Sequence, residues 1–254
     1  MPSRYNLLVD IGNTFIKWGR YRVSGNGSAD DNCIESGHAL LGEMPSLAGV
    51  WSRHPPPNRA VIANVGGTRA RATMIRVLEI WPNAPQHWVV SERVQCGVRN
   101  GYRNPAQLGP DRWAAMIAAR RIVGENPVLV VVCGTATTID FVTATGEFTG
   151  GVIMPGIGMM IRSLHEGTAA LPDADGQYTD HPQQTVDAIV SGCQHAQAGA
   201  VERIYRLHQG SHAGLICLIS GGASKALAPR LSIPFRLTEN LVLEGLHRIA
   251  VTLQ

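Results

Sequence analysis

The sequence has little charge and no long apolar run. Only 16% of its 254 residues are charged, and the formal net charge is +3, so the composition gives no support to a dedicated nucleic-acid binder. No stretch reaches the roughly 18 uninterrupted apolar residues of a membrane-spanning helix. The apolar stretch nearest the start, Leu7–Val9, is too short for the core of a signal peptide. We therefore expect a protein that binds neither nucleic acid nor membrane.

Cysteine is scarce and shows no pairing pattern. The five cysteines are Cys33, Cys96, Cys133, Cys193 and Cys217. Their number is odd, they are widely scattered, and no two form a Cys-x-x-Cys pair. Neither a zinc site nor a disulfide framework is therefore predicted. This usage favours a reducing, cytoplasmic location.

The signatures of several enzyme classes are also absent. The chain has no P-loop, no Gly-x-Ser-x-Gly nucleophile elbow, no His-Glu-x-x-His zinc motif and no Gly-x-Gly-x-x-Gly dinucleotide fingerprint. An apolar share of 44% nevertheless indicates a globular protein with a real core. Any phosphate-binding site must therefore be built from other glycine turns.

Two stretches of the chain are alike in design. Residues 5–23 and residues 128–153 each read as an apolar strand, a glycine turn and a second strand, and the later stretch continues into a third strand. Each is followed by helix-like and strand-like segments, expected at 59–65, 69–80, 87–90, 110–123, 156–164, 185–208, 215–220 and 241–253. This repetition predicts two related α/β lobes, which we place at residues 1–112 and 113–254. Residues 52–59 read as a loop, and residues 30–44 give no clear assignment.

The first glycine turn has the residues of a phosphate site. Asp10 ends the strand, Gly12 lets a phosphate approach the backbone, and Lys17 offsets phosphate charge. Asn13 and Thr14 add hydrogen-bond donors to a concavity of backbone N–H groups. Asp10 is suited to hold Mg²⁺ through water. The alternative is an ordinary hairpin, in which Gly-Asn and a nearby Asp are common.

Two further glycine turns follow strands in the second half. Cys133–Asp140 places small hydroxyl side chains after Gly134, where Thr135 is suited to grip phosphate oxygens. Gly221 and Gly222 lie between a strand and a helix, a position that favours a ligand such as adenosine. Each turn alone is equally compatible with an ordinary strand or strand-to-helix connection. Two phosphate turns facing each other would hold one nucleotide.

Five short segments occur in a characteristic order. They are Asp10–Thr14, Gly101–Trp113, Cys133–Asp140, Gly150–Gly156 and Ser220–Ala223. In this order they resemble the type III pantothenate kinases, and the resemblance extends over most of the chain. It implies an α/β fold of two ribonuclease-H-like lobes, as in the actin-like ATPases, with a nucleotide cleft between them.

The resemblance also implies a reaction. The family uses ATP and Mg²⁺ to phosphorylate the primary hydroxyl of pantothenate, the first step of coenzyme A synthesis. Asp111 matches the family's proton acceptor. The matching pantothenate-contacting positions are Tyr102, Gly109, Pro110, Asp111, Arg112 and Thr185. The family is a homodimer, and Thr185 stands where the second subunit is expected to complete the substrate pocket.

The residues and the resemblance together predict the nucleotide contacts. These are Asp10, Ile11, Gly12, Asn13, Thr14, Lys17, Thr135, Gly221 and Gly222. An ionised carboxylate at Asp111 can accept a hydroxyl proton, and the planar fork of Arg112 suits a substrate carboxylate. The alternative for Asp111 is an acid favoured by the dipole at the start of a helix.

One position departs from the family pattern. Many members bind a monovalent cation, K⁺ or NH4⁺, through an Asp two residues before the second Gly-Thr turn, but here that position is Val132. Valine cannot ligate a cation, so strong K⁺ dependence is not expected. The functional alternative is a non-catalytic, nucleotide-binding regulatory protein of the same fold. The presence of Asp111 and Lys17 favours the kinase.

Overall fold

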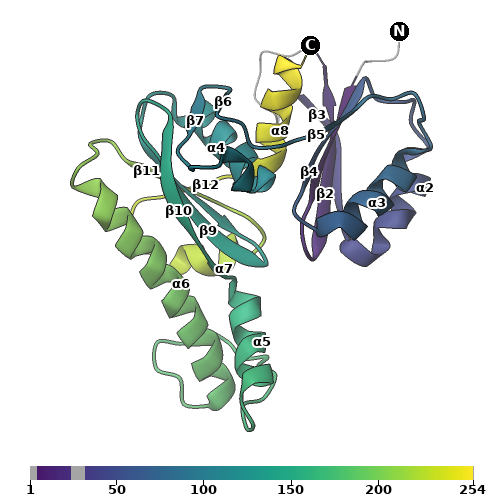
Figure 1. Cartoon of the computed structure of the whole chain (residues 1–254). Coiled ribbons are helices and arrows are strands. Elements are labelled where there is room, and N and C mark those ends of the chain that lie inside the picture. Colours follow the sequence, from purple (N-terminus) through teal and green to yellow (C-terminus); the bar gives the residue numbers. More distant parts are fainter. Residues whose placement is uncertain (1–4, 24–31, 254) are drawn as a thin grey trace. The chain divides into compact units, whose positions relative to one another are not determined.

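The computed structural model describes residues 5–23 and 32–253 (Figure 1). Contacts between Cα atoms divide the chain into two compact units. Unit 1 comprises residues 1–122 and 240–254, and unit 2 comprises residues 123–239. Within the described ranges, no helix combines the length and the apolar character needed to cross a membrane.

Unit 1 is built on a five-stranded sheet in the order β3-β2-β1-β4-β5. The strands are β1 (Tyr5–Ile11), β2 (Phe15–Arg22), β3 (Cys33–Leu40), β4 (Arg59–Asn64) and β5 (Gln86–Trp88). Neighbouring strands are antiparallel from β1 to β3 and parallel from β1 through β4 to β5. β1 is buried along nearly its whole length, as its central place in the sheet requires.

Helices cover both faces of the unit 1 sheet (Figure 1). The helical segments of this unit are η1 (Leu41–Ser46), α2 (Leu47–Trp51), α3 (Gly67–Leu78), η2 (Pro105–Gln107), α4 (Pro110–Val123) and α8 (Leu241–Thr252). On one face, alternate β1 residues such as Leu7 and Val9 pack with Met74 of α3 and Trp51 of α2. On the other face lies α8, which contacts β1, β2 and β4. The short strands β6 (Val94–Gln95) and β7 (Val98–Asn100) form an antiparallel pair that precedes η2.

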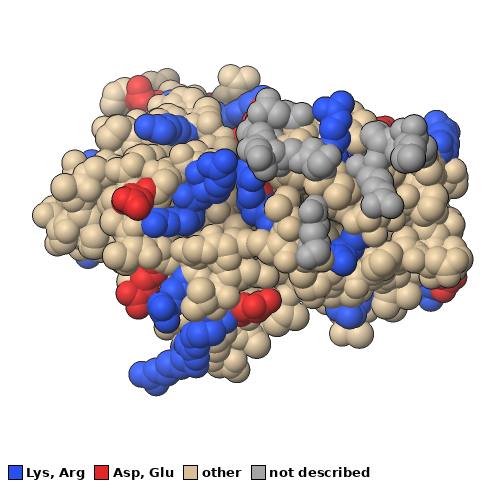
Figure 2. Space-filling view, turned by 90° about the horizontal axis from the view of Figure 1, so that it is seen from above, with Lys and Arg blue, Asp and Glu red and all other residues tan. Residues whose placement is uncertain are grey.

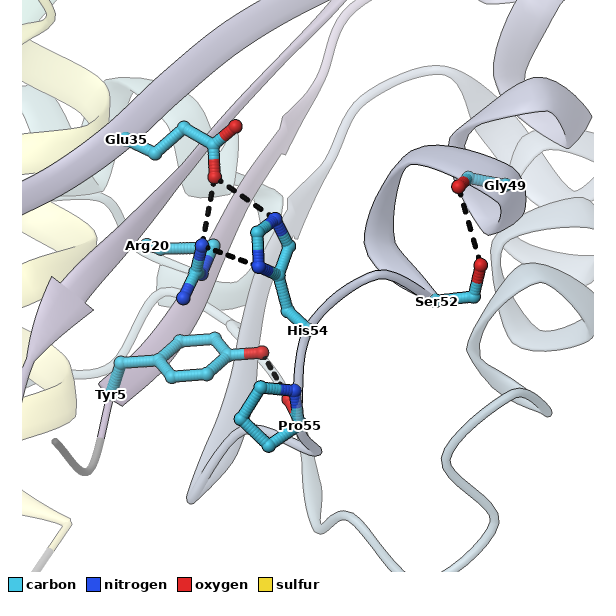
Figure 3. Close-up of polar contacts among 7 residues, drawn as sticks. All are labelled: Tyr5, Arg20, Glu35, Gly49, Ser52, His54 and Pro55. Atoms are coloured by element: carbon cyan, nitrogen blue, oxygen red, sulfur yellow. Dashed lines mark hydrogen bonds and ion pairs between the residues drawn. The ribbon is translucent and has the colours of Figure 1, made fainter. Parts of the chain in front are cut away.

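A polar cluster fastens the proline-rich loop of residues 52–58 to the sheet (Figure 3). Arg20 Nη1 lies 2.8 Å from Glu35 Oε2 and 2.9 Å from His54 Nδ1. The same guanidinium lies over the Tyr5 ring at 4.4 Å, and the Tyr5 hydroxyl donates to the Pro55 carbonyl. The loop predicted here is confirmed, and its contacts explain how it keeps a fixed path without secondary structure.

Unit 2 repeats the strand arrangement of unit 1. Its strands are β8 (Val128–Cys133), β9 (Ala136–Val142), β10 (Glu147–Pro155), β11 (Ile216–Ser220) and β12 (Arg236–Leu237). They lie in the order β12-β11-β8-β9-β10, antiparallel from β8 to β10 and parallel from β8 through β11 to β12. Read outward from the central strand, this is the order of unit 1. The prediction of two ribonuclease-H-like lobes is thereby confirmed.

The helices of unit 2 follow its hairpins. They are α5 (Ile157–Gly167), α6 (Thr185–Gln209), α7 (Ser224–Leu227) and η3 (Ala228–Arg230). The core of this unit joins Val131 and Phe141 of the sheet to Val201 and Tyr205 of α6. α6 is 25 residues long and also packs against α5 through Ile189 and Cys193.

The compact units differ from the predicted lobes of residues 1–112 and 113–254 at two places. Most of α4 belongs to unit 1, and so does α8 at the far end of the chain. The lobe boundary at residue 112 stays a prediction. In the unassigned region 30–44, residues 30 and 31 lie outside the described residues, while residues 33–44 form β3 and part of η1.

Candidate active site

The first glycine turn closes the β1–β2 hairpin at one end of the unit 1 sheet. Asp10 pairs with Lys17 across the two strands, and both are half-buried. The Gly12 amide donates to the Phe15 carbonyl at 3.0 Å, and Asn13 and Thr14 are exposed at the tip. The hairpin predicted here is confirmed.

Ile11 differs from the other predicted nucleotide contacts. Its side chain is fully buried in the unit 1 core. Its carbonyl accepts the Val65 amide at 2.9 Å. Any part that Ile11 takes in a site is therefore confined to fixing the backbone from which Gly12 leaves the strand.

Asp111 lies in the first turn of α4. The backbone of Gly109 lies close to the Asp111 carboxylate, because a Cβ added at residue 109 would lie 2.5 Å from Asp111 Oδ1. The Gly109 carbonyl accepts the Trp113 amide at 3.0 Å, which starts the helix. Burial raises the pKa of Asp111, while the backbone amide and the guanidinium of Arg112 act in the opposite direction. Glycine at position 109 thus gives the carboxylate its space.

Asp10 and Asp111 act on each other electrostatically within unit 1. Burial, and secondarily the charge of Asp111, raise the pKa of Asp10 to about 7, while the charge of Lys17 acts in the opposite direction. Two carboxylates that disfavour each other's charge fit a divalent cation. Among residues 5–23 and 32–253, no three His, Cys, Asp or Glu side chains gather as a metal cluster. A pair of aspartate carboxylates offers oxygen ligands of the kind that a hydrated Mg²⁺ accepts.

Arg112 is held by Tyr102. Arg112 is only 5% exposed, its Nη1 donates to the Tyr102 hydroxyl at 3.1 Å, and its Cζ lies 5.8 Å from the centre of the Tyr102 ring. Pro110 occupies the first position of α4, where its missing amide costs no hydrogen bond. The five predicted substrate positions of unit 1 therefore lie in one loop and the helix start that follows it: Tyr102, Gly109, Pro110, Asp111 and Arg112.

The glycine turns of unit 2 pack closely together. The Thr135 carbonyl accepts the Gly156 amide at 2.9 Å, and a Cβ on residue 156 would overlap the Gly134 carbonyl. Gly221 has a φ of +100°, and a Cβ there would overlap the backbone of Cys133. Thr135, Gly221 and Gly222 therefore border the same end of β8, which is the arrangement that a phosphate and nucleoside site needs.

Thr185 and Val132 lie elsewhere in unit 2. Thr185 is the exposed first residue of α6, and the Asp187 carboxylate fixes this start by accepting from the Gln177 amide and the Gln184 side chain. Val132 is half-buried in β8, between Thr138 and Ser220 on the neighbouring strands. The structure offers no ligand for a cation in the Val132 side chain itself.

Sequence reasoning missed Gly66 and Gly67. They follow β4 in unit 1 just as Gly221 and Gly222 follow β11 in unit 2. A Cβ on Gly66 would lie 2.9 Å from the Gly12 carbonyl, and Gly67 has a φ of +85°. The signal was present, because the glycine pair recurs at the same place in the internal repeat.

Comparison with known proteins agrees with these features. The model of the family described as type III pantothenate kinase matches residues 6–207. The type III pantothenate kinase of Aromatoleum aromaticum is 46% identical over 245 residues, which cover 96% of this chain and 97% of the relative. That of Dechloromonas aromatica is 45% identical over 244 residues, covering 96% and 98%.

Solved structures of low sequence identity show the fold. A Sinorhizobium meliloti protein classed as a 2-dehydro-3-deoxygalactonokinase has a TM-score of 0.60 at 12% identity, covering 98% of this chain and 99% of its own. A Campylobacter jejuni protein classed with the Baf family of transcriptional activators has a TM-score of 0.58 at 20% identity, covering 96% of each chain. With near-complete coverage of closely similar relatives and the matched family model, the chain belongs to the type III pantothenate kinase family.

Proposed function

We propose that the protein transfers the γ-phosphoryl group of ATP to the primary hydroxyl of pantothenate, giving 4′-phosphopantothenate in the first step of coenzyme A synthesis. The observation that carries the proposal is the 46% identity over almost the full length of a relative that bears this name. The site of unit 1 supports it, because the half-buried Asp111 carboxylate, a lysine and a guanidinium bonded to Tyr102 are groups that this chemistry needs.

Asp111 is the proposed general base. Burial raises its pKa, so it accepts a proton more readily than an ordinary aspartate, while the amide and guanidinium of Arg112 favour its ionised form. Its carboxylate would take the proton from the pantothenate hydroxyl as the oxygen attacks phosphorus. Arg112, already desolvated, would bind the substrate carboxylate through its planar fork. Tyr102, Gly109 and Pro110 would line the same pocket.

The nucleotide would be held by the glycine turns. Unit 1 would supply Asp10, Gly12, Asn13, Thr14 and Lys17 to the phosphates, with the buried Ile11 shaping their backbone. Unit 2 would supply Thr135 to the phosphates and the Gly221–Gly222 backbone to the adenosine. Mg²⁺, held by Asp10 through water, would neutralise charge on the transferred group.

A second copy of the chain completes the proposed enzyme. We propose a homodimer in which Thr185 of one copy lines the pantothenate pocket of the other; the exposure of Thr185 at the start of α6 supports this. We propose a cytoplasmic location, since the five cysteines are free thiols. Because the Val132 side chain has no ligating atom, we propose that the enzyme works without K⁺ or NH4⁺.

Pantothenate-dependent release of ADP tests the proposal. The purified protein is assayed with Mg-ATP, with and without pantothenate, in sodium and in potassium buffers. ADP release that requires pantothenate and is equal in both buffers is the expected result. ATP binding without pantothenate-dependent release would overturn the kinase in favour of the nucleotide-binding regulator.

A further inference from the structure

A buried asparagine organises the loop that leads to the candidate base. Asn100 ends β7 and is only 1% exposed. Its Oδ1 accepts the Tyr102 amide at 3.0 Å, and its Nδ2 donates to the Pro105 carbonyl at 3.2 Å. Its own amide donates to the Arg93 carbonyl at 2.9 Å. One side chain thus joins the two ends of a tight turn that contains Tyr102.

The Arg93 side chain also hydrogen-bonds to the backbone of this turn, from its solvent-exposed side. This exposed side chain donates to the carbonyls of Asn100, Tyr102 and Arg103, at 3.4, 3.1 and 3.4 Å respectively. The last part of the loop is fixed separately, because the buried Ser91 hydroxyl donates to the Leu108 carbonyl at 2.8 Å. The backbone from residue 100 to residue 108 is therefore held at both ends by side chains that precede it.

These contacts lead to the guanidinium of Arg112. The Tyr102 hydroxyl accepts from Arg112 at 3.1 Å, so the position of Tyr102 contributes to the direction of that guanidinium. A buried polar side chain whose two ends both bond to backbone has few ways to move, and it transmits its position to the turn. Asn100 itself has no place in the predicted contacts with substrate or nucleotide.

We propose that Asn100 is a positioning residue that, through Tyr102, aims Arg112 at the carboxylate of the substrate. The proposal rests on the proposed function, since it assigns Arg112 a carboxylate to bind. It predicts that loss of Asn100 weakens use of acidic substrate more than use of ATP. A residue with a merely structural role would lower both together.

Steady-state kinetics of Asn100→Ala test this. Loss of the two side-chain bonds should lower kcat/KM for pantothenate by about tenfold to a hundredfold. A displacement of the substrate-binding group by up to about 1 Å costs this much. KM for ATP should stay within about twofold. The neutral alcohol analogue of pantothenate, which lacks the carboxylate, should lose much less than pantothenate does.

Two further variants keep the test decisive. Arg93→Met removes the Arg93 hydrogen bonds to the turn. Because this position is exposed, folding is not at risk. The variant should lower kcat/KM for pantothenate by a smaller factor than Asn100→Ala does. Asn126→Ala is the matched control, since it removes a side-chain bond of 2.9 Å to the Val123 carbonyl far along the chain from the loop. It should leave the ratio of the two KM values unchanged.

Amide hydrogen exchange separates this inference from the proposed function. Faster exchange at residues 101–108 in Asn100→Ala and Arg93→Met, but not in Asn126→Ala, is expected whether or not pantothenate is the substrate. Unchanged exchange overturns the positioning role. Faster exchange with equal losses for pantothenate and its neutral analogue overturns the link to Arg112. A wild type that does not turn over pantothenate refutes the proposed function instead, and exchange still decides whether Asn100 holds the loop.

Discussion

The space for the Asp111 carboxylate depends on one missing methyl group. A Cβ on residue 109 would lie 2.5 Å from Asp111 Oδ1, well inside van der Waals contact. The φ of Gly109 is not in the left-handed region, so its backbone conformation does not require glycine. Glycine is needed here because it leaves space for the carboxylate.

Gly109→Ala should therefore damage catalysis more than folding. We expect kcat to fall by about a hundredfold as the carboxylate is pushed off its place, with a change in Tm of only a few degrees. The control is Gly49→Ala in α2, where an added Cβ meets nothing within 4 Å. Steady-state kinetics beside thermal melts check this, and normal turnover in Gly109→Ala would contradict the placement of Asp111.

At the scale of elements, α4 and α8 touch backbone to backbone. A Cβ on Gly245 of α8 would overlap the Ala114 carbonyl of α4. The first turn of α4 carries Asp111. The close packing of α8 against α4 therefore helps to fix the position of Asp111 in unit 1.

Gly245→Ala should destabilise unit 1. Overpacking at a close helix crossing costs about 1–3 kcal/mol, although alanine itself favours a helix. Gly199→Ala in α6 is the matched control, because its Cβ would meet nothing within 4 Å, and it should stabilise slightly. Denaturant unfolding of both variants measures the contrast. Equal effects would show that the two helices separate without cost.

The sequence predicted elements with strong periodicity and missed those set by distant contacts. The helix expected at 110–123 and the strand expected at 59–65 are found at Pro110–Val123 and Arg59–Asn64. The sequence gives no assignment for β3 because residues 30–44 are polar and irregular in pattern. In the fold Gly37 makes room for the Trp18 indole, since a Cβ there would lie 2.8 Å from the ring.

The sequence predicts those parts of the candidate site that are local in the chain, and it does not reveal the contacts between distant segments. Gly109, Asp111 and Arg112 are adjacent in sequence, so a local motif reveals them. The closeness of Asp10 to Asp111 and the support of Tyr102 by Asn100 arise only when β1, β7 and α4 pack in one unit. Likewise, nothing local indicates that α8 joins the first unit rather than the second.

For the whole molecule, charge is moderate and uneven. Figure 2 shows one face on which Lys and Arg side chains are more prominent than Asp and Glu, in line with the net charge of +3.

Inside unit 1, His247 is fully buried beside Tyr21, with ring centres 5.4 Å apart, and neither of its ring nitrogens has a hydrogen-bond partner among the described residues.

Global stability should therefore depend on pH through His247. Burial, and secondarily the charge of Arg248, lower its pKa to about 4. The unfolded chain binds this proton below about pH 6.5, whereas the folded chain binds it only near pH 4, so the stability that His247 contributes falls as pH drops through this window. Relative to pH 7.5, the loss from His247 alone at pH 5 should be about 2 kcal/mol, whereas the raised pKa of Asp10 acts in the opposite direction because the folded chain holds that proton more tightly.

Denaturant unfolding at pH 7.5 and pH 5 measures this loss. His247→Phe keeps an aromatic ring beside Tyr21 and removes the titrating group, so its stability at pH 5, relative to its own stability at pH 7.5, should exceed that of wild type by about 2 kcal/mol. Replacement of the exposed His181 by Gln is the control and should keep the wild-type dependence. An identical dependence in His247→Phe would contradict the account.

The central claim is that this chain phosphorylates pantothenate with Asp111 as the base. Its most direct test is identification of the product by mass spectrometry and phosphorus NMR after incubation with Mg-ATP, for wild type and Asp111→Asn in parallel. We predict 4′-phosphopantothenate from wild type and a rate lower by about a hundredfold to ten-thousandfold from the variant, with ATP binding retained. Absence of the phosphoester from the wild-type reaction, or its formation at an equal rate by Asp111→Asn, would contradict the claim.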